Sequence, residues 1–433
     1  MAATEKLLKA SGVLYTDRRD FYVSPNVVKE LWTDVAPFTT VISNMETRQT
    51  PDPVFKMFEH RNPWVKQYFL NNGDTDNLDS DTTTNTTVTV DGASNINIDD
   101  SLVGTICEVW TTGYGTKKAV VRVDSVTSST VIVVNTLWTS TGSDIALADD
   151  DIFEVIGNAQ GEGTTAPEAW SDELSVVYNS CQIFKTPLQI TGTLLQASLR
   201  GESSELSRLR AQKNQEHKMQ KEKAFLYGHR VGGTNLGGSD TFADGGVLDA
   251  DGNLVRTTYG IVKALEDFGA SSGDDQSVFT VSEASYTYNS FVDDMEKVFQ
   301  YVPTSGVKRA FCGAGALSYW SKMAGTTGMG GNSGWTINVG DMKRDSLGFN
   351  YKTLETPHGI LQLIPTPALR GAYNGYMLIV DEENLFHAQY RQPMYQTNIK
   401  SDNAFDAVKD QYFSDEGVGI TLIESHNLMK VTS

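Results

Sequence analysis

The longest helix predicted from the sequence lies in SELSRLRAQKNQEHKMQKEKAFLYGHR, residues 204–230. This stretch has no proline and no glycine before Gly228, and these are the two residues that weaken a helix most. Before the cluster Ala224–Tyr227 its apolar residues are only Leu206, Leu209 and Met219, apart from one alanine. A helix that is polar on every side needs support from neighbouring elements or from ion pairs. The sequence therefore predicts a long helix that is stabilised mainly from outside itself.

The charges of this helix are unbalanced. Between Leu206 and Arg230 there are seven basic residues but only two acidic ones, Glu216 and Glu222. Ion pairs within the helix are worth only about 0.2–0.5 kcal/mol each, too little to hold so long a segment. We interpret the surplus positive charge as facing acidic neighbouring subunits. A solvated surface helix of a single subunit is the alternative, and a third one, binding to nucleic acid, is disfavoured by the charge of the whole chain.

Composition limits the possible functions. The 433 residues are 39% hydrophobic and 21% charged, which is typical of a globular protein of several domains. The net charge of −19 disfavours non-specific wrapping of a polyanion. The N-terminal segment has no secretory signal, and no apolar run approaches the roughly 20 residues that span a bilayer. Three widely separated cysteines predict a reducing compartment and no disulfide framework. They are Cys107, Cys181 and Cys312.

The N-terminal part is predicted to be an arm followed by an extended segment. A helix is expected over residues 24–36, where Ser24 is the N-cap, Pro25 takes the first position and Pro37 ends the run. Pro51, Pro53 and Pro63 then favour extended chain. The aromatic residues of this extended segment require a partner surface, and they are Phe55, Phe58, Trp64, Tyr68 and Phe69.

From about residue 72 to 163 the composition changes to acidic residues, threonine and short valine-rich runs, which predicts a small all-β unit. Helical patterns on both sides indicate that this unit is an insertion. Farther along, SYTYNSFVDDMEKVFQYV (residues 285–302) predicts an amphipathic helix. VKRAFC (307–312) predicts a strand leading into another helix, and the last eighty residues alternate strand and turn signals.

No complete catalytic or cofactor motif is present. Gly313-x-Gly315-x-x-Ser318 follows a strand, as a dinucleotide-binding loop would, but the third glycine and the acidic residue are missing. The acidic segments around Asp74–Asp81 and Asp249 lack the calcium-loop pattern, so we expect solvated loops. The six histidines are dispersed. The sequence predicts neither an enzyme nor a cofactor or metal site.

The segment Lys221–Gly228, KEKAFLYG, and the C-terminal pattern ETPHGILQLIP…GYMLIVDEENLFHAQYRQP…ESHNLMKV carry a resemblance. Together with the order of arm, extended segment, β insertion and long helix, they resemble the major capsid proteins of tailed bacteriophages. These proteins share the shell fold named after phage Hong Kong 97. The similarity is to the branch with a β-domain inserted before the long spine helix. The resemblance implies an α+β fold with an N-terminal arm, an extended loop, a peripheral domain built on the spine helix and an axial domain.

The resemblance also implies a domain order. We expect the arm and the start of the extended loop in residues 1–72 and the inserted β-domain in 73–163. The return of the loop and the spine helix are expected in 164–240, the axial domain with part of the peripheral domain in 241–395, and closing C-terminal strands in 396–433.

The implied function is a non-enzymatic one. Copies of the chain would form pentamers and hexamers of an icosahedral shell around double-stranded DNA, without sequence-specific DNA binding. Portal, decoration and scaffold proteins are expected partners. Because the chain begins only shortly before the arm helix, the resemblance implies a separate scaffold protein or none. The shell would assemble in the host cytoplasm, with no membrane involved. No motif carries over the Lys–Asn cross-link of some relatives.

Two alternatives stay open from the sequence, another virion component such as a β-rich tail or baseplate protein, and a metal-assisted hydrolase. For the shell, Trp64 and its aromatic neighbours are predicted to anchor the loop on an adjacent subunit, burying about 150–250 Å² each. Arg208, Arg210 and Lys213 are predicted to meet acidic residues across the interface. The candidate intersubunit contacts are therefore Trp64, Phe55, Phe58, Tyr68, Arg208, Arg210 and Lys213.

Overall fold

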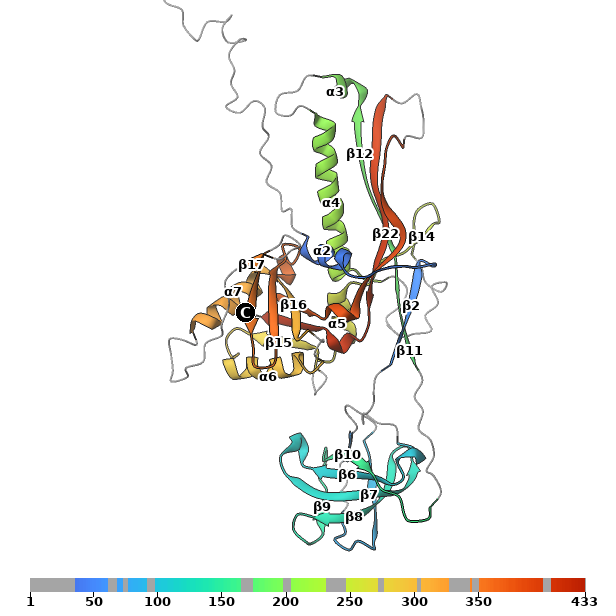
Figure 1. The fold of residues 1–433 in the computed structure, drawn as a ribbon, viewed down its shortest axis with the longest axis vertical. Helices are drawn as coiled ribbons and strands as arrows, with labels where there is room; N and C mark the ends of the chain where they lie inside the picture. The colour runs from blue at the N-terminus through green and yellow to red at the C-terminus, as the bar shows by residue number, and fades with distance from the viewer. Residues whose placement is uncertain are drawn as a thin grey trace, which may run out of the picture. The chain divides into compact units, whose positions relative to one another are not determined.

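The computed structural model describes the chain over residues 36–60, 68–72, 77–91, 98–164, 174–197, 204–230, 247–271, 276–301, 305–326, 343–344, 350–399 and 406–432. The chain folds into two compact units, one of residues 60–175 and one of residues 1–59 and 176–433 (Figure 1). Residues 24–35 of the predicted helix over 24–36 lie outside the described residues. The mixture of helices and several sheets confirms the predicted α+β class. The finer division into five parts stays a prediction.

The unit of residues 60–175 is built on a six-stranded antiparallel sheet, in the order β3-β10-β6-β7-β8-β5. A bridge between Asn71 and Val90 joins the two outer strands, so the sheet closes on itself as a small barrel. The sequence predicted these strands from their valine-rich runs, and the structure confirms them. They are β3 (Tyr68–Leu70), β5 (Asn85–Thr89), β6 (Thr105–Trp110), β7 (Lys117–Ser128), β8 (Val131–Thr139) and β10 (Ile152–Asn158), and β4 (Asn77–Leu78) pairs separately with β9 (Ile145–Ala146).

Every second side chain of these strands points into the barrel and fills its inside. In β7, Ala119, Val121 and Val123 are fully buried while the residues between them are partly exposed, because successive side chains of a strand point to opposite faces. The rings of Phe69 and Phe153 stack in the core with their centroids 5.0 Å apart. The unit therefore has a hydrophobic core of its own.

The larger unit contains a seven-stranded mixed sheet in the order β15-β23-β20-β16-β19-β18-β17. Both faces of this sheet are buried. Leu378 and Val380 of β20 join one core cluster, with helices α2, α4 and α5, while Met377 and Ile379 join the other, with α6 and α7. The strands are β15 (Val278–Ser282), β16 (Val307–Cys312), β17 (Lys343–Arg344), β18 (Asn350–Glu355), β19 (Ile360–Pro365), β20 (Tyr376–Val380) and β23 (Asn427–Thr432).

The helices of this unit follow the predicted patterns. The amphipathic helix is confirmed as α6, with Phe291 and Met295 on its buried side. The sequence did not predict the helix that begins at Pro37, which stands at the first position of that helix, where its missing N–H is no loss. The helices are α2 (Pro37–Asn44), α3 (Gly192–Gln196), α4 (Glu205–Tyr227), α5 (Ile261–Phe268), α6 (Tyr288–Val298) and α7 (Ala314–Thr326).

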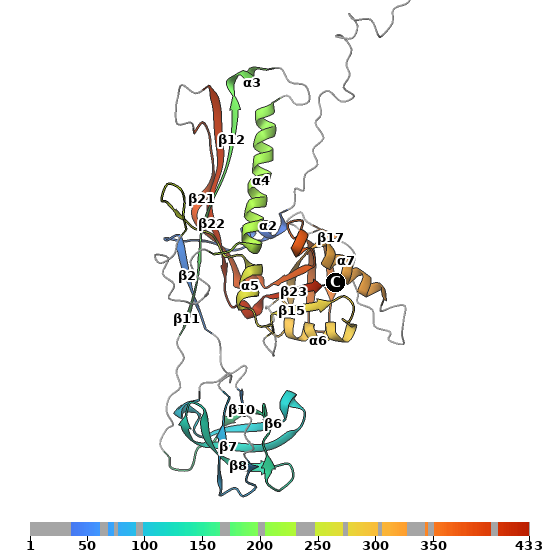
Figure 2. The same cartoon turned by 180° about the vertical axis from the view of Figure 1, so that it is seen from behind.

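A second sheet supports the long helix. Its order is β1-β21-β22-β12, and α4 lies alongside β12 and β22 (Figures 1 and 2). A two-stranded ribbon, β2 (Val54–Glu59) with β11 (Ser175–Ser180), and the small hairpin β13 (Val247–Leu248) with β14 (Leu254–Val255) complete the described strands. The strands of the second sheet are β1 (Thr47–Gln49), β12 (Gln182–Thr191), β21 (Leu385–Gln396) and β22 (Ala407–Ile420).

Candidate functional site

The long helix α4 contacts strand β22 through a row of polar side chains. Arg210, His217 and Lys221 follow one another at intervals of seven and four residues, which places them on one face of the helix. Their partners on β22 are Asp410, Ser414 and Glu416. These residues are four and two positions apart, so their side chains lie on one face of the strand. We call this contact the α4–β22 polar interface.

The two polar rows match in length. From Arg210 to Lys221 the helix rises about 16 Å, and from Asp410 to Glu416 the strand extends about 20 Å. Helix and strand can therefore run side by side with every pair in contact. The helix, which has few apolar residues along most of its length, is thus supported there by polar contacts with β22.

At one end of the interface, Arg210 bonds to Asp410 at 2.7 Å. The carboxylate of Asp410 is fully buried and also accepts from the hydroxyl of Tyr395 and the amide of Asn398. Burial alone would raise the pKa of Asp410, but these three donors outweigh burial and lower it. Removing Arg210 would leave the buried carboxylate of Asp410 without its positively charged partner. Losing one partner of a buried ion pair costs about 3–5 kcal/mol when no other group stabilises the remaining charge.

At the other end, Lys221 bonds to Glu416 at 3.1 Å, and the imidazole of His387 lies 3.4 Å from the same carboxylate oxygen. Burial acts to raise the pKa of Glu416, yet the contacts with His387 and Lys221 lower it overall. Glu416 therefore stays ionised in a buried position because two basic side chains converge on it.

His217 joins the helix to both neighbouring strands in the middle of the interface. Its Nδ1 lies 3.0 Å from the hydroxyl of Thr186 on β12, and its Nε2 lies 3.0 Å from the hydroxyl of Ser414 on β22. Burial, and next the charge of Lys221, lower the pKa of His217 to about 4. The imidazole is therefore neutral near pH 7 and serves as a hydrogen-bonding link.

Glu222 connects α4 to the end of the arm. Its side chain is fully buried and accepts hydrogen bonds from the amides of Phe38 and Thr39, at 3.1 and 2.6 Å, and from the Thr39 hydroxyl at 2.7 Å. These amides belong to the first turn of α2, whose own N-cap residue, Ala36, has no side-chain acceptor. Glu222 therefore caps α2 from a distant part of the chain.

The end of α4 is an ordinary core anchor, as its sequence suggested. Phe225 and Leu226 are fully buried in the cluster shared with α2 and α5. The ring of Phe225 meets the ring of Phe184 edge-on, with 6.1 Å between centroids.

The predicted charged contacts all have partners in the same chain. Arg208 bonds to Glu205 and Lys213 to Glu216, both one turn apart on α4, and Arg210 bonds to buried Asp410. Their pairing with acidic residues of a neighbouring subunit stays a prediction.

The aromatic residues predicted to contact a neighbouring subunit differ in how exposed their side chains are. Phe55 is buried on β2 and packs against Phe386 at 6.1 Å between centroids. Phe58, three residues later, is 73% exposed. Tyr68 is half-buried on β3 in the other unit, and Trp64 lies outside the described residues.

Sequence reasoning missed His217 and Glu222. The one sequence signal for the polar interface was the spacing of Arg210, His217 and Lys221. These polar residues recur at intervals that place them on one face of a helix. Nothing in the sequence distinguishes Glu222 from a solvated glutamate between two lysines.

The near-miss motifs have structural roles. Gly313 and Gly315 form a strand-to-helix turn against Asn374, where an added Cβ would approach the Asn374 carbonyl oxygen to 2.4 and 2.9 Å. The amide of Gly315 donates to the Asn374 side chain at 3.1 Å, which leaves it engaged within the protein rather than with a phosphate. The carboxylate of Asp249 accepts from the amides of Asp251 and Asn253 in its own turn.

Among the residues that the structure describes, no group of three or more His, Cys, Asp or Glu side chains is placed to hold a metal ion. Within the same ranges, no helix is long and apolar enough to cross a membrane. The three cysteines are buried, and burial raises the pKa of the Cys107 thiol to about 12.

Comparison with known proteins identifies the family. A family model described as "SU10 major capsid protein" matches residues 26–420. This match covers most of the chain and defines a structural protein that forms the shell of a phage. The chain belongs to the SU10 major capsid protein family. The match confirms the predicted phage capsid fold and favours it over a tail protein or a hydrolase.

Solved capsid structures are similar at low sequence identity. The capsid of a native GTA particle has a TM-score of 0.45 and 9% identity, over 99% of this chain and 100% of that chain. The mature capsid of bacteriophage PhiM1 has a TM-score of 0.39 and 8% identity, over 64% and 79%. A structure of Mycobacterium phage Patience has 0.39 and 10%, over 64% and 78%. No curated protein matches the sequence.

Proposed function

We propose that this major capsid protein assembles, as pentamers and hexamers, into an icosahedral shell around the double-stranded DNA of a tailed phage. Assembly takes place in the host cytoplasm, and portal, scaffold and decoration proteins are its partners. The protein has no catalytic role and binds DNA without sequence specificity. The net charge of −19 supports this, because a shell that repels phosphate does not retain the DNA it must release.

The observation that carries the assembly proposal is the two-faced ribbon β2–β11. On one face, Phe55 and Met57 are buried against Phe386 in a small core cluster. On the opposite face, Phe58 is 73% exposed and Val176 is 38% exposed. One face thus anchors the ribbon in its own subunit, while the other presents a large ring to solvent.

An exposed phenylalanine on a ribbon whose other strand also exposes an apolar residue is typical of a protein contact site. We infer that Phe58 packs on an adjacent subunit in the shell. Trp64, a few residues later in the same segment, is proposed to extend that contact. Burying an aromatic side chain of this size removes roughly 150–250 Å² from water.

The test is Phe58→Ala, with Lys56→Ala as the matched control, because Lys56 is exposed on the same face of β2. Phe58→Ala is expected to leave the subunit folded, by circular dichroism, and to reduce shell yield and the melting temperature of shells in electron microscopy and calorimetry. Lys56→Ala should assemble as the unchanged protein does. Shells of unchanged yield and stability from Phe58→Ala would refute the contact.

A further inference from the structure

The unit of residues 60–175 holds most of the net negative charge. It contains five Lys or Arg and eighteen Asp or Glu, a net charge of −13 out of the −19 of the whole chain. A surface with this charge attracts cationic partners and repels anionic ones over distances of about 8–10 Å.

Three aromatic side chains lie at one corner of this acidic unit. The rings of Trp110 and Tyr114 are 6.3 Å apart between centroids. The indole N–H of Trp110 donates to Glu108, which also pairs with Lys117. We call this set, completed by Trp138, the aromatic corner.

Trp138 continues the corner onto the next strand. The ammonium group of Lys117 lies 5.6 Å from the centre of the Trp138 ring, and β8, which carries Trp138, pairs with β7 beside Lys117. Trp138 is 49% exposed and Tyr114 is 41% exposed. Two exposed aromatic rings on one small unit are an unusual feature for a protein surface.

The backbone holds Tyr114 in this exposed position. Its φ angle of 57° is left-handed, a conformation that costs a bulky residue energy and is often kept at functional positions. The hairpin around it is fastened by the hydroxyl of Thr112, which donates to the carbonyls of Asp149 and Asp150 at 3.3 Å.

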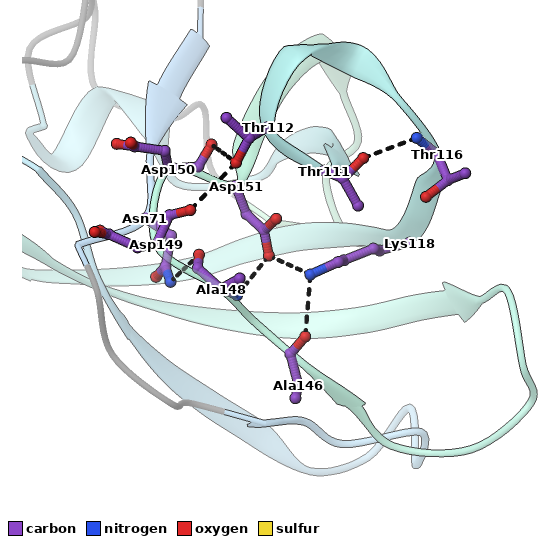
Figure 3. A network of polar contacts seen from close by, with 10 residues as sticks. All are labelled: Asn71, Thr111, Thr112, Thr116, Lys118, Ala146, Ala148, Asp149, Asp150 and Asp151. Carbon is purple, nitrogen blue, oxygen red and sulfur yellow. Dashed lines mark hydrogen bonds and ion pairs between the residues drawn. The ribbon is translucent and has the colours of Figure 1, made fainter.

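Further hydrogen bonds hold the turn that carries Asp149 and Asp150. Lys118 bonds to Asp151 at 2.5 Å, and Asp151 also accepts from the amide of Ala148 (Figure 3). Asn71 donates to the carbonyl of Ala148 at 2.9 Å. Several hydrogen bonds therefore hold the turn against which the Tyr114 segment rests.

We propose that the aromatic corner is a docking surface for a lysine- or arginine-rich segment of a second protein. The faces of tryptophan and tyrosine rings attract cations. Lys117 already makes such a contact with Trp138, so the incoming segment would meet Tyr114 and the part of Trp138 that stays exposed. The net charge of the unit adds long-range attraction for such a segment. Polyanions are excluded by the same charge.

The experiment measures binding of a short labelled peptide of alternating arginine and glycine to assembled shells at physiological salt. Tyr114→Asn removes the ring while keeping a residue that accepts left-handed backbone, and Trp138→Thr removes the ring while keeping strand propensity. Each variant is expected to weaken peptide binding about three- to fivefold. Trp138→Phe, which keeps a ring, should bind nearly as the unchanged protein does.

The control is Ile156→Thr, which removes a 54% exposed apolar side chain from β10 of the same unit and should not change binding. Equal binding by shells with and without the rings would overturn the proposal, because attraction would then come from diffuse charge. Ring-dependent binding of a neutral dextran, without ring-dependent binding of the peptide, would also overturn it and indicate a glycan surface. Shell melting temperatures verify that each variant is folded.

Discussion

Replacing Glu222 tests how much its buried carboxylate contributes to holding the start of α2 on the long helix. Glu222→Ala would remove the acceptor of three hydrogen bonds, from the Phe38 amide, the Thr39 amide and the Thr39 hydroxyl. Each buried donor left without an acceptor costs about 1–3 kcal/mol. Allowing for some relaxation, we expect a loss of about 3–5 kcal/mol in the free energy of unfolding. Glu222→Gln keeps one acceptor oxygen and should lose about 1–2 kcal/mol.

The pH dependence of stability gives an independent measure of the same group. Burial raises the pKa of Glu222, and the donors from Thr39 and Phe38 only partly oppose this rise. The folded state therefore binds the proton at a higher pH than the unfolded state does. The contribution of Glu222 to stability is greatest below pH 4.5 and falls as pH rises through the folded-state pKa, by at most about 1.4 kcal/mol per pH unit. Glu222→Gln should remove this slope.

Both effects can be followed by urea unfolding of unassembled subunits, monitored by circular dichroism and fluorescence between pH 4.5 and 8. Glu216→Ala is the matched control, since Glu216 lies on the same helix but its side chain is 43% exposed and pairs with Lys213. It should cost less than about 1 kcal/mol. If Glu222→Ala cost no more than Glu216→Ala, the remote cap would be refuted.

Two further predictions concern the polar interface. Because burial lowers the pKa of His217 to about 4, the unfolded state binds a proton that the folded state does not between about pH 6.5 and 4, so stability should fall as pH falls through that window. His217→Gln should abolish this part of the slope in the same unfolding assay, and an unchanged slope would contradict it. Arg210→Glu should destabilise the isolated subunit, because it sets a carboxylate against buried Asp410. Lys213→Glu should leave the subunit folded and impair shell assembly, and normal shells would refute a role for Lys213 at the interface.

Much of the secondary structure could be predicted from the sequence because local patterns decide it. The alternating valines of β7 specify a strand with one buried face, and the apolar stripe of α6 specifies an amphipathic helix. The length of α4 follows from its lack of proline and internal glycine. The predicted family followed from the order of these elements together with the segment Lys221–Gly228.

The support of α4 could not be predicted, because it depends on contacts between residues far apart in the chain. A basic helix in an acidic protein can satisfy its charges in water, in its own subunit or in a neighbour, and composition does not distinguish these. Arg210 meets Asp410 across 200 positions. Strand alternation places Phe55 and Phe58 on opposite faces of β2. The sequence could not show which of these two faces is buried, because that depends on contacts with distant residues.

The sequence alone thus determined the elements, their order and the family, since each depends on local periodicity or on a pattern along the chain. Tertiary structure alone decided which polar residues are buried. Desolvation makes a buried charge unfavourable unless donors or opposite charges converge on it, and that convergence exists only in the folded chain. In the long helix, His217 and Glu222 are indistinguishable from solvated residues until β22 and α2 pack against them.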